Sequence, residues 1–402
     1  MNAAARRAAI GIALAGAAML GLSMGLRQTL GLFLEPMTAA IGVSHSSFGL
    51  AIAVQNLLWG ALTPAFGAVA DRWGTGRVLL LGALLYGAGL VMMGLVQTPF
   101  GLHFGGGILI GIAVSATGFP LVLSAVARSV PAERRSAWMG LATAGGSIGQ
   151  FALLPSAQGL IQVLGWAGAL VGLGSLALLM LPLARPLRGK PAVEVGGQRL
   201  GEAVTEARSH RGYLLLNAGF FVCGFHVAFI ATHLPSYVTN AGLSAFAGAT
   251  ALGVIGFFNV IGTFGAGWLG GRYRKKYLLS GIYVARALLV ASLVVVPLDA
   301  VTLYVIAAAI GLLWLGTVPL TSGVVGDIFG ARYLATLFGF VMFSHQVGAF
   351  CGAWLGGLSY DLTGSYDAVW WLAAGLSLLS AVIHWPIADQ PIRRPLREGA
   401  PA

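Results

Sequence analysis

Between two long apolar segments of this chain stands the stretch Gly67-Ala68-Val69-Ala70-Asp71-Arg72-Trp73-Gly74-Thr75-Gly76-Arg77. Gly67 lets two helices approach closely, and the Asp71 carboxylate can accept charge-assisted hydrogen bonds from a neighbouring helix end. Arg72 and Arg77 can form ion pairs across the same short turn. Such a turn has the features of a latch that closes a gate, so we predict gating roles for Asp71, Arg72 and Arg77.

The composition on both sides of this stretch is typical of a membrane protein. Only 9% of the 402 residues are charged, 57% are hydrophobic, and the mean hydropathy is +0.86. A soluble domain carries roughly a quarter of its residues as charges. So much apolar surface has no core large enough to bury it, so the solvent must be lipid. The two cysteines, Cys223 and Cys351, stand alone in apolar runs and indicate neither a disulfide framework nor a metal site.

Twelve apolar runs are long enough to span a bilayer. They cover residues 8–37, 48–70, 77–97, 102–127, 136–160, 164–184, 212–239, 246–271, 277–297, 301–326, 333–358 and 366–387. The chain is therefore expected to be an all-α polytopic membrane protein. We predict an N-terminal six-helix bundle (1–184), a central loop (185–211) and a C-terminal six-helix bundle with a short tail (212–402). The length of the first run and the eleven runs after it argue against a signal peptide.

The basic residues predict the orientation in the membrane. All of them except Arg27 and Arg286 fall in the loops and tails of one side, and the opposite loops hold none. By the positive-inside rule, both termini and the central loop are expected in the cytoplasm. The membrane is expected to be the inner membrane of a bacterium. The formal net charge of +11 is thus explained by topology and does not indicate binding to nucleic acid.

The two halves of the chain resemble each other at an offset of 199–200 residues. Matching pairs are Pro36 and Pro235, Gly67 and Gly267, Pro120 and Pro319, Gly140 and Gly339, and Gly149 and Gly348. A period of half the chain indicates two copies of one six-helix unit, a parallel repeat of the kind found in transporters.

The stretch from Gly67 to Arg77 resembles the signature G-x-x-x-D-[RK]-x-G of the major facilitator superfamily. The resemblance implies the major facilitator fold, two pseudo-symmetric six-helix bundles, and says nothing of the substrate. Thr75 and Gly76 stand where the signature is usually basic, which implies a weaker latch. The second-half counterpart, Gly267 to Arg272, lacks the acid. The alternative, a basic loop that contains an aspartate by chance, is disfavoured by the repeat around it.

Three further stretches resemble bacterial relatives of the monocarboxylate transporters, a group that also resembles the oxalate:formate antiporters. They are Gly25–Met37, Phe220–Phe225 with His233-Leu234-Pro235, and Tyr360–Tyr366. The resemblance implies transport of small carboxylates, often with a proton. Animal members carry an Asp and an Arg four residues apart in helix 8, where this chain has Asn259 and Thr263. The resemblance therefore implies that the usual carboxylate clamp is absent from helix 8.

Two cations lie well inside apolar runs. A charge in the hydrocarbon region costs several kcal/mol, so Arg27 and Arg286 are functional candidates, and none of the twelve acids lies deep in a helix to pair with them. A guanidinium matches a carboxylate bidentately, and Arg27 is the preferred substrate-binding residue, since helices 1, 4, 7 and 10 line the cavity in the family that the chain resembles. The alternative for Arg27 is a brace on backbone carbonyls. For Arg286, in helix 9, a structural role is favoured.

Three residues are candidates for a coupling proton. His226 matches Arg27 at the repeat offset, so we expect it across the cavity from the arginine, and His345 lies at mid-membrane in helix 11. A histidine titrates near neutral pH, although a neutral histidine bonded between helices is an equal alternative for each. Glu35, near the end of helix 1, is the third candidate.

Four polar residues in apolar runs complete the predicted substrate-binding set with Arg27, His226 and His345. They are Gln55, Asn56, Gln150 and Asn259. Each can bond a substrate or only join helices, and joining is the commoner role of a single polar residue.

The sequence contains no P-loop, metal-ligand cluster or nucleophile–base arrangement, so neither an enzyme nor a cofactor is expected. We predict a monomeric secondary transporter of a small organic anion, a monocarboxylate in the first place. It would use symport with a proton or anion exchange. The alternative is an efflux transporter for amphipathic drugs or metabolites. Against it, helix 5 lacks the proline of the drug:proton antiporters.

Overall fold

The structure is a computed structural model that describes residues 3–129, 135–189, 200–330 and 334–392. Eleven helical segments of these residues are long and apolar enough to cross a membrane. In chain order the elements are α1 (Ala3–Thr29), η1 (Leu30–Phe33), α2 (Leu34–Ile41), α3 (His45–Trp73), α4 (Thr75–Leu95), η2 (Gly101–Leu109), α5 (Ile110–Thr117), α6 (Phe119–Arg128), α7 (Arg135–Ala177), α8 (Met180–Leu183), α9 (Leu200–Ser209), α10 (Arg211–Asn240), α11 (Ala245–Gly270), α12 (Lys275–Val295), α13 (Ala300–Leu313), α14 (Thr317–Phe329), α15 (Leu334–Thr363) and α16 (Asp367–His384). The polytopic all-α prediction is confirmed.

The segments number eleven because α7 holds two of the twelve predicted helices. Gly165, with φ 70° and ψ 169°, interrupts its helical backbone. Before this residue α7 runs parallel to α1: Gly21 faces Gly145 and Gly25 faces Gly149. Beyond Gly165 the chain runs antiparallel to α4, because Gly94 faces Ala167 and Gly87 faces Gly174. The chain therefore reverses at Gly165, where only glycine adopts a positive φ without strain.

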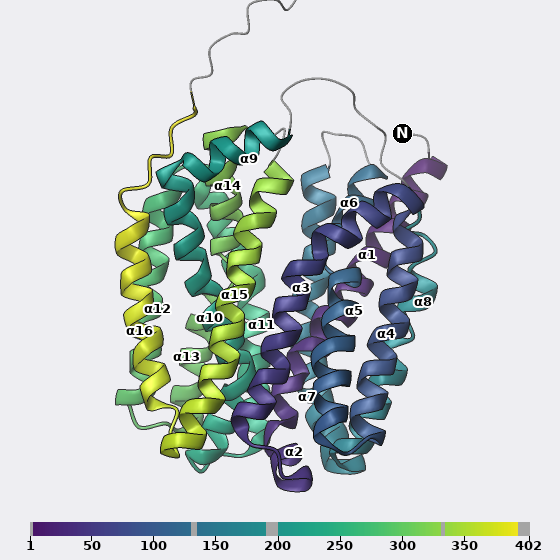
Figure 1. The fold of residues 1–402 in the computed structure, drawn as a ribbon, viewed down its shortest axis with the longest axis vertical. Coiled ribbons are helices and arrows are strands. Elements are labelled where there is room, and N and C mark those ends of the chain that lie inside the picture. The colour runs from purple at the N-terminus through teal and green to yellow at the C-terminus, as the bar shows by residue number, and fades with distance from the viewer. Residues whose placement is uncertain (1–2, 130–134, 190–199, 331–333, 393–402) are drawn as a thin grey trace, which may run out of the picture.

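Two helical groups stand side by side (Figure 1): α1 to α8 form one half and α9 to α16 the other. The halves meet along two seams, the α3–α15 seam and the α7–α11 seam. The segment 185–211, predicted as a loop, contains the short helix α9, which buries Ala203 and Ala207.

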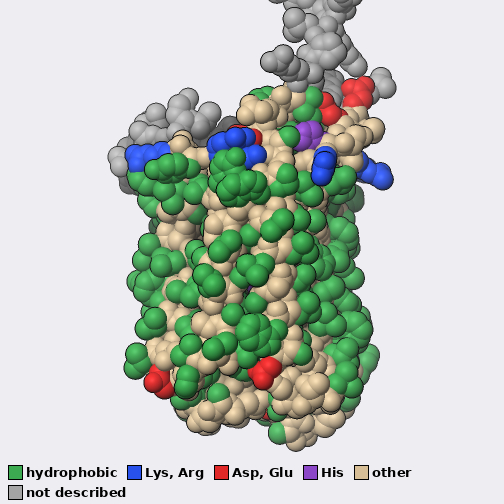
Figure 2. Space-filling model, turned by 90° about the vertical axis from the view of Figure 1, so that its left-hand side faces the viewer, with side chains coloured by type: hydrophobic (Ala, Val, Ile, Leu, Met, Phe, Trp, Pro, Cys, Tyr) green, Lys and Arg blue, Asp and Glu red, His purple; other side chains and the backbone are tan. Residues whose placement is uncertain are grey.

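The basic side chains gather at one end of the molecule. On the face drawn in Figure 2, Lys and Arg lie at the upper end above a broad apolar band. We call this the basic end; α3 ends there at Trp73 and α11 at Gly270. The far end is the opposite one, where α2 lies (Figure 1). Between them the surface exposes large apolar side chains, such as Leu84, Phe264, Leu288 and Val382. Such a continuous apolar band needs lipid around it.

The halves are closed against each other at the far end. A Cβ added to Gly31, Gly49 or Gly357 would collide with a backbone carbonyl oxygen of the other half: Ala231, Ala353 and His45, respectively. Glycine removes the side chain, so the backbones approach closely. In addition, the Asp361 carboxylate accepts hydrogen bonds from the backbone N–H of His45 at 3.0 Å and of Ser46 at 2.8 Å.

The basic end differs from the far end. Around the repeat-related glycines Gly67, Gly140, Gly267 and Gly339, a Cβ would meet no atom within 4 Å. Gly67, which we expected to pack closely against another helix, therefore faces open space in this conformation. At the far end, three hydrogen bonds join the halves.

The repeat extends to buried hydrogen bonds. The Ser23 and Thr117 hydroxyls lie 2.8 Å apart, and 200 residues later the Cys223 thiol lies 3.2 Å from the Thr317 hydroxyl. Each pair joins the first helix of a half to its broken fourth helix.

Helices 4 and 10, predicted as continuous over 102–127 and 301–326, are each interrupted. Helix 4 breaks at Gly118, which is extended with φ −78° and ψ −178°, and helix 10 breaks between Leu313 and Thr317. Pro120 and Pro319 follow these breaks within two to five residues. Proline has no N–H for the helical ladder, so both breaks have the same local cause.

Candidate functional site

Arg27 on α1 reaches toward α3. Its Nη2 donates a hydrogen bond to Asn56 Oδ1, and its guanidinium lies 4.8 Å from the centre of the Trp59 ring. Asn56 in turn donates from Nδ2 to the Ile52 carbonyl at 2.8 Å, which directs Oδ1 toward the arginine. We call Arg27, Asn56 and Trp59 the Arg27 cluster. The hydrogen bond from Asn56 to the Ile52 carbonyl, one turn earlier in α3, fixes the orientation of the asparagine within it.

The cluster lies next to the other half. Gly31, one turn beyond Arg27, contacts Ala231, and Gly60, next to Trp59, contacts Gln346. The side chain of Arg27 is partly exposed although it belongs to a spanning helix. The Arg27 guanidinium therefore lies close to the contact between the two halves.

The charge of Arg27 has no partner among the described residues. No carboxylate of this part of the chain lies within ion-pair distance of it, and its Nε is buried without a hydrogen bond. Its one hydrogen-bond partner in the structure is the Asn56 side chain, not a backbone carbonyl as the brace alternative requires. An unpaired guanidinium in low dielectric favours an anion strongly.

Arg286 differs from Arg27 in both respects. It is 4% exposed, and its Nη2 donates to the carbonyls of Leu313, at 2.5 Å, and Trp314. Its Nη1 lies 3.5 Å from the Cys223 sulfur. These contacts agree with the structural role favoured by the sequence.

The two glutamines of the predicted set lie against different helices. Gln55 is turned away from Arg27: its Nε2 donates to the Gly106 carbonyl at 2.8 Å and joins α3 to η2. Gln150 on α7 is buried, and its Cβ lies 3.2 Å from the place of a Cβ at Gly256 on α11. Gln150 therefore belongs to the α7–α11 seam.

Asn259 spans the same seam. Its Nδ2 donates to Ser147 Oγ at 3.2 Å, and its Oδ1 accepts from the Leu315 backbone N–H and from Thr263 Oγ1, both at 3.0 Å. The two helix-8 positions named by the family resemblance thus bond to each other, and no charge stands at either of them.

From the repeat we expected His226 to lie opposite Arg27. The structure places it elsewhere. Its Nε2 lies 2.9 Å from the Ala373 carbonyl, on the side of α10 that packs against α16 within the same half. The offset of 199 residues puts the two residues at the same level of their helices but not on matching faces. His345 packs its ring on Phe220, also within the C-terminal half, with Nδ1 3.4 Å from Gln346 Oε1.

Glu35 lies where the halves are closed. Its carboxylate accepts a hydrogen bond from Ser236 of the other half and lies 3.1 Å from His45 Nε2. His45 Nδ1 lies 3.7 Å from the Asp361 carboxylate. One imidazole thus stands between two carboxylates from opposite halves. We call Glu35, His45 and Asp361 the far-end network. Neither His45 nor Asp361 was predicted from the sequence, although Asp361 lies in the quoted Tyr360–Tyr366 stretch.

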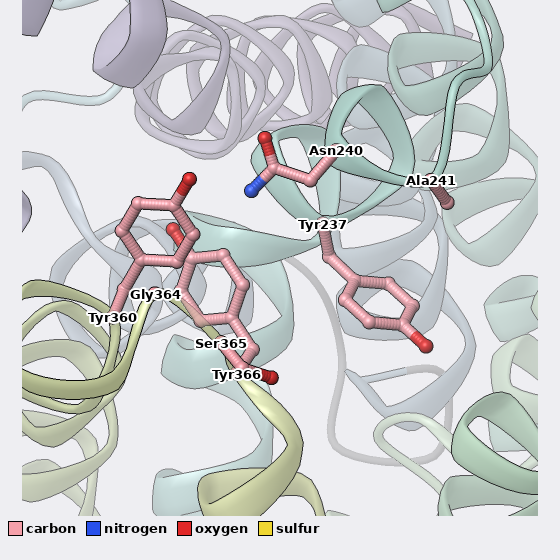
Figure 3. A pocket seen from close by; sticks show the side chains of 7 residues that line it. All are labelled: Tyr237, Asn240, Ala241, Tyr360, Gly364, Ser365 and Tyr366. Atoms are coloured by element: carbon pink, nitrogen blue, oxygen red, sulfur yellow. The ribbon is translucent and has the colours of Figure 1, made fainter.

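A pocket of about 160 Å³ opens beside this network (Figure 3), lined by Tyr237, Asn240, Ala241, Tyr360, Gly364, Ser365 and Tyr366. The Tyr360 ring lies over the His45 ring at 4.2 Å between centroids. All lining residues belong to the C-terminal half, and the pocket holds none of the predicted site residues.

The predicted latch at the basic end is not formed in this conformation by the side chains that the structure describes. Arg72 and Arg77 are exposed, Arg72 lies over the Trp73 ring, and neither has an ion pair among the described residues. The side chain of Asp71 lies outside the described part. A Cβ at Gly67 would likewise meet no described atom within 4 Å, so the close helix contact expected there is not formed.

Just after the second-half counterpart of the latch, two basic residues pair with acids from distant parts of the chain, which the sequence did not indicate. Lys275 Nζ lies 2.7 Å from Asp327, and Arg274 lies 2.5 Å from Asp389. The Arg274 guanidinium holds the pKa of Asp389 below its usual range. A lowered pKa of a carboxyl group means that this pair weakens only as the pH falls through that low value, so it is no switch near neutrality.

Comparisons with known proteins point to one family. Residues 13–346 match the Major Facilitator Superfamily. Monocarboxylate transporter 11 of Mus musculus is 27% identical, with 93% of this chain and 86% of that protein covered. Monocarboxylate transporter 13 of Rattus norvegicus is 27% identical over 86% and 79%. The MFS-type transporter YcxA of Bacillus subtilis (strain 168) is 23% identical over 89% and 90%.

Among solved structures, the fold is similar to that of a bacterial homolog to the human lysosomal transporter Spinster, in an inward-facing and unoccupied conformation. The TM-score is 0.71 at 14% identity, with 94% of this chain and 95% of that one covered. At this identity the likeness shows the fold alone. The relatives and the fold are those of transporters and not of enzymes.

Proposed function

The chain belongs to the Major Facilitator Superfamily, and on this basis we propose that it is a secondary active transporter of a small organic anion, in the first place a monocarboxylate. The observation that carries the proposal is the unpaired, partly exposed Arg27 beside the contact between the halves. The similarity to monocarboxylate transporters supports the same substrate class.

The Arg27 cluster suits one carboxylate. Nη2 is engaged by Asn56, while Nε is without a partner, so a small rotation presents a fork of two N–H groups. Trp59 supplies an apolar wall against the guanidinium face and for the short carbon chain of a monocarboxylate. Asn56 can then donate to the anion in place of its own helix carbonyl.

Transport would follow by alternating access. The halves touch at the far end, and the repeat-related glycines of the basic end face open space. By the positive-inside rule the basic end is cytoplasmic, together with both termini. This conformation is then the inward-facing one. The protein would act as a monomer in a bacterial inner membrane.

In intact cells, an impermeant thiol reagent should label Gln97→Cys and leave Arg188→Cys unlabelled, because the first lies at the far end and the second at the basic end. The reverse pattern would contradict this orientation.

For proton coupling, the geometry favours Glu35 over the two histidines. Glu35 bonds across the halves, whereas His226 and His345 pack within one half. The titratable side chains around Glu35 are His45, Asp361, His233 and Tyr366. A proton on Glu35 removes the negative charge that His45 and Ser236 hold and would loosen the far-end closure.

We therefore expect Glu35→Gln to abolish uptake driven by a pH gradient and to retain exchange of labelled for unlabelled substrate. His226→Gln and His345→Gln, as controls, should keep the pH dependence. The measurement is uptake into proteoliposomes with and without an imposed gradient. Full pH dependence in Glu35→Gln would move the proton to another group.

A thermal-shift screen of the purified protein tests the substrate class. Formate, acetate, lactate and pyruvate are compared with their neutral amides and with lipophilic cations. A carboxylate that binds should raise the melting temperature as its concentration rises, while its amide should not. Stabilisation by the cations alone would instead support the efflux of amphipathic compounds.

A further inference from the structure

We propose that Arg286 is a positioning residue: it holds the break of helix 10 so that the backbone N–H of Leu315 orients Asn259 at the α7–α11 seam. The inference goes beyond the proposed function and depends on it only in assuming that the seam matters for switching. Arg286 is a buried cation outside the Arg27 cluster, and its contacts carry the proposal.

The break between α13 and α14 leaves carbonyl groups that need donors. The helical ladder stops at Leu313 and resumes at Thr317, and Pro319 brings no N–H to it. Arg286 Nη2 donates to both the Leu313 and Trp314 carbonyls. The C-terminal end of a helix is the negative end of its dipole, so a buried guanidinium stabilises α13 there.

The N–H that follows these two carbonyls reaches the seam. Leu315 donates at 3.0 Å to Asn259 Oδ1, which also accepts from Thr263 Oγ1. Two donors on Oδ1 fix the amide plane, so Nδ2 faces Ser147 in the other half at 3.2 Å. A continuous set of hydrogen bonds thus leads from Arg286, on α12, to a contact between the halves.

The first half of the repeat does without this device. At the matching position, 200 residues earlier, stands Tyr86, whose hydroxyl donates to the Ser23 carbonyl at 2.8 Å and not to the break at Gly118. The position that matches Asn259 is Trp59, which lies under Arg27. Arg286 therefore is not a general requirement of the repeat; it belongs to the one half whose seam residue needs an oriented amide.

Disulfide formation at the two seams tests the proposal in the full chain without any ligand. The first cysteine pair is Gln150→Cys with Gly256→Cys on the α7–α11 seam, where the Cβ positions are 3.2 Å apart. The reference pair is Gly60→Cys with Gln346→Cys on the α3–α15 seam, at 2.8 Å. Both distances are shorter than the Cβ–Cβ spacing of a disulfide, about 3.5–4.5 Å, so each pair can be bridged once the two helices move apart slightly, the reference pair by more than the first. Cys351→Ser removes the accessible native thiol; Cys223 is buried and stays. A protease site inserted between Lys190 and Arg199 separates the halves on a gel.

We expect Arg286→Met to slow oxidation of the α7–α11 pair about tenfold, the effect of leaving buried carbonyls without a donor, and to leave the reference pair unchanged. Arg286→Lys should restore part of the rate, because an ammonium keeps the charge but lacks the fork. Tyr283→Phe is the matched control: it removes a hydrogen bond to Gly219 from the same helix and should change neither pair.

Equal slowing of both pairs would show that Arg286 only stabilises the fold, and no slowing of either would show that the break holds itself; each result overturns the proposal. If Arg286→Met does not fold, Arg286→Lys and Asn259→Ala make the same comparison, and both must slow the α7–α11 pair selectively. Since no substrate is added, a failure of carboxylate binding elsewhere leaves these outcomes unaffected.

Discussion

Arg27→Gln should lose carboxylate binding while the protein still inserts and purifies normally. Removing one partner of a desolvated, hydrogen-bonded charge pair costs about 2–5 kcal/mol, which corresponds to a loss of about 30-fold or more in affinity. Arg27→Lys should be damaging as well, because an ammonium keeps the charge but cannot present two N–H groups to a carboxylate. The measurement is the shift in melting temperature against lactate or pyruvate concentration.

Asn56→Asp gives a second and sharper form of this test. It places a carboxylate within reach of Arg27 and so supplies the internal partner that the described structure lacks. Substrate carboxylate must then compete with an internal anion, so affinity should fall although Arg27 is intact. The matched control is Gln55→Met, one residue earlier, since Gln55 bonds to Gly106 and points away from the cluster.

Near-normal carboxylate affinity in folded Arg27→Gln would show that Arg27 does not hold the anion. The arginine would then be a structural residue of the α1–α3 contact, and the proposed substrate class would lose its principal support. A loss in Asn56→Asp without a loss in Arg27→Gln would contradict the same assignment.

Gly31→Leu should prevent closure of the far end and shift the protein away from the conformation described. A side chain at Gly31 collides with the Ala231 carbonyl of the other half, and a backbone cannot move aside as a side chain can. Overpacking costs about 1–3 kcal/mol where neighbours can relax, which already changes a conformational equilibrium by about 5-fold to 150-fold.

The measurement is the distance between spin labels on cysteines at Ala40 and Asn240, exposed residues of the two halves at the far end. In a Cys351→Ser background this distance should lengthen in Gly31→Leu. It should stay short in the control Gly281→Leu on α12, because nothing lies within 4 Å of a Cβ there. Gly67→Leu should also keep the short distance, since Gly67 is unpacked in this state. An unchanged distance in Gly31→Leu would show that the halves do not close through this contact.

Features that depend on local composition could be predicted without any structure. The length of each apolar run decides whether a segment can cross a bilayer, and the side on which arginines fall predicts its orientation. The repeat was visible because equivalent turns need the same glycine or proline in both halves. Arg27 stood out for the same kind of reason: a charge in an apolar run is costly wherever its helix packs.

Features that depend on the rotation of a helix about its axis could not be predicted. α10 is apolar on nearly every side, so its periodicity does not show which face meets the other half, and His226 faces α16 and not Arg27. The far-end network likewise joins Glu35 to Asp361, residues more than 300 positions apart that only the closed halves bring to one imidazole.

Sequence alone thus determined that this chain is a twelve-helix transporter built on a repeat, with a cation deep in helix 1 and no acid deep in any helix to pair with it. The tertiary structure decided which polar residues accompany that cation: Asn56 and Trp59 do, whereas Gln55 and His226 do not. It also showed that the two intramembrane arginines differ. Arg27 is partly exposed and bonds to a side chain, whereas Arg286 is buried and bonds to backbone carbonyls. The physical reason is that composition sets the solvent of a segment, while the partner of each buried polar group is set by packing between segments distant in the chain.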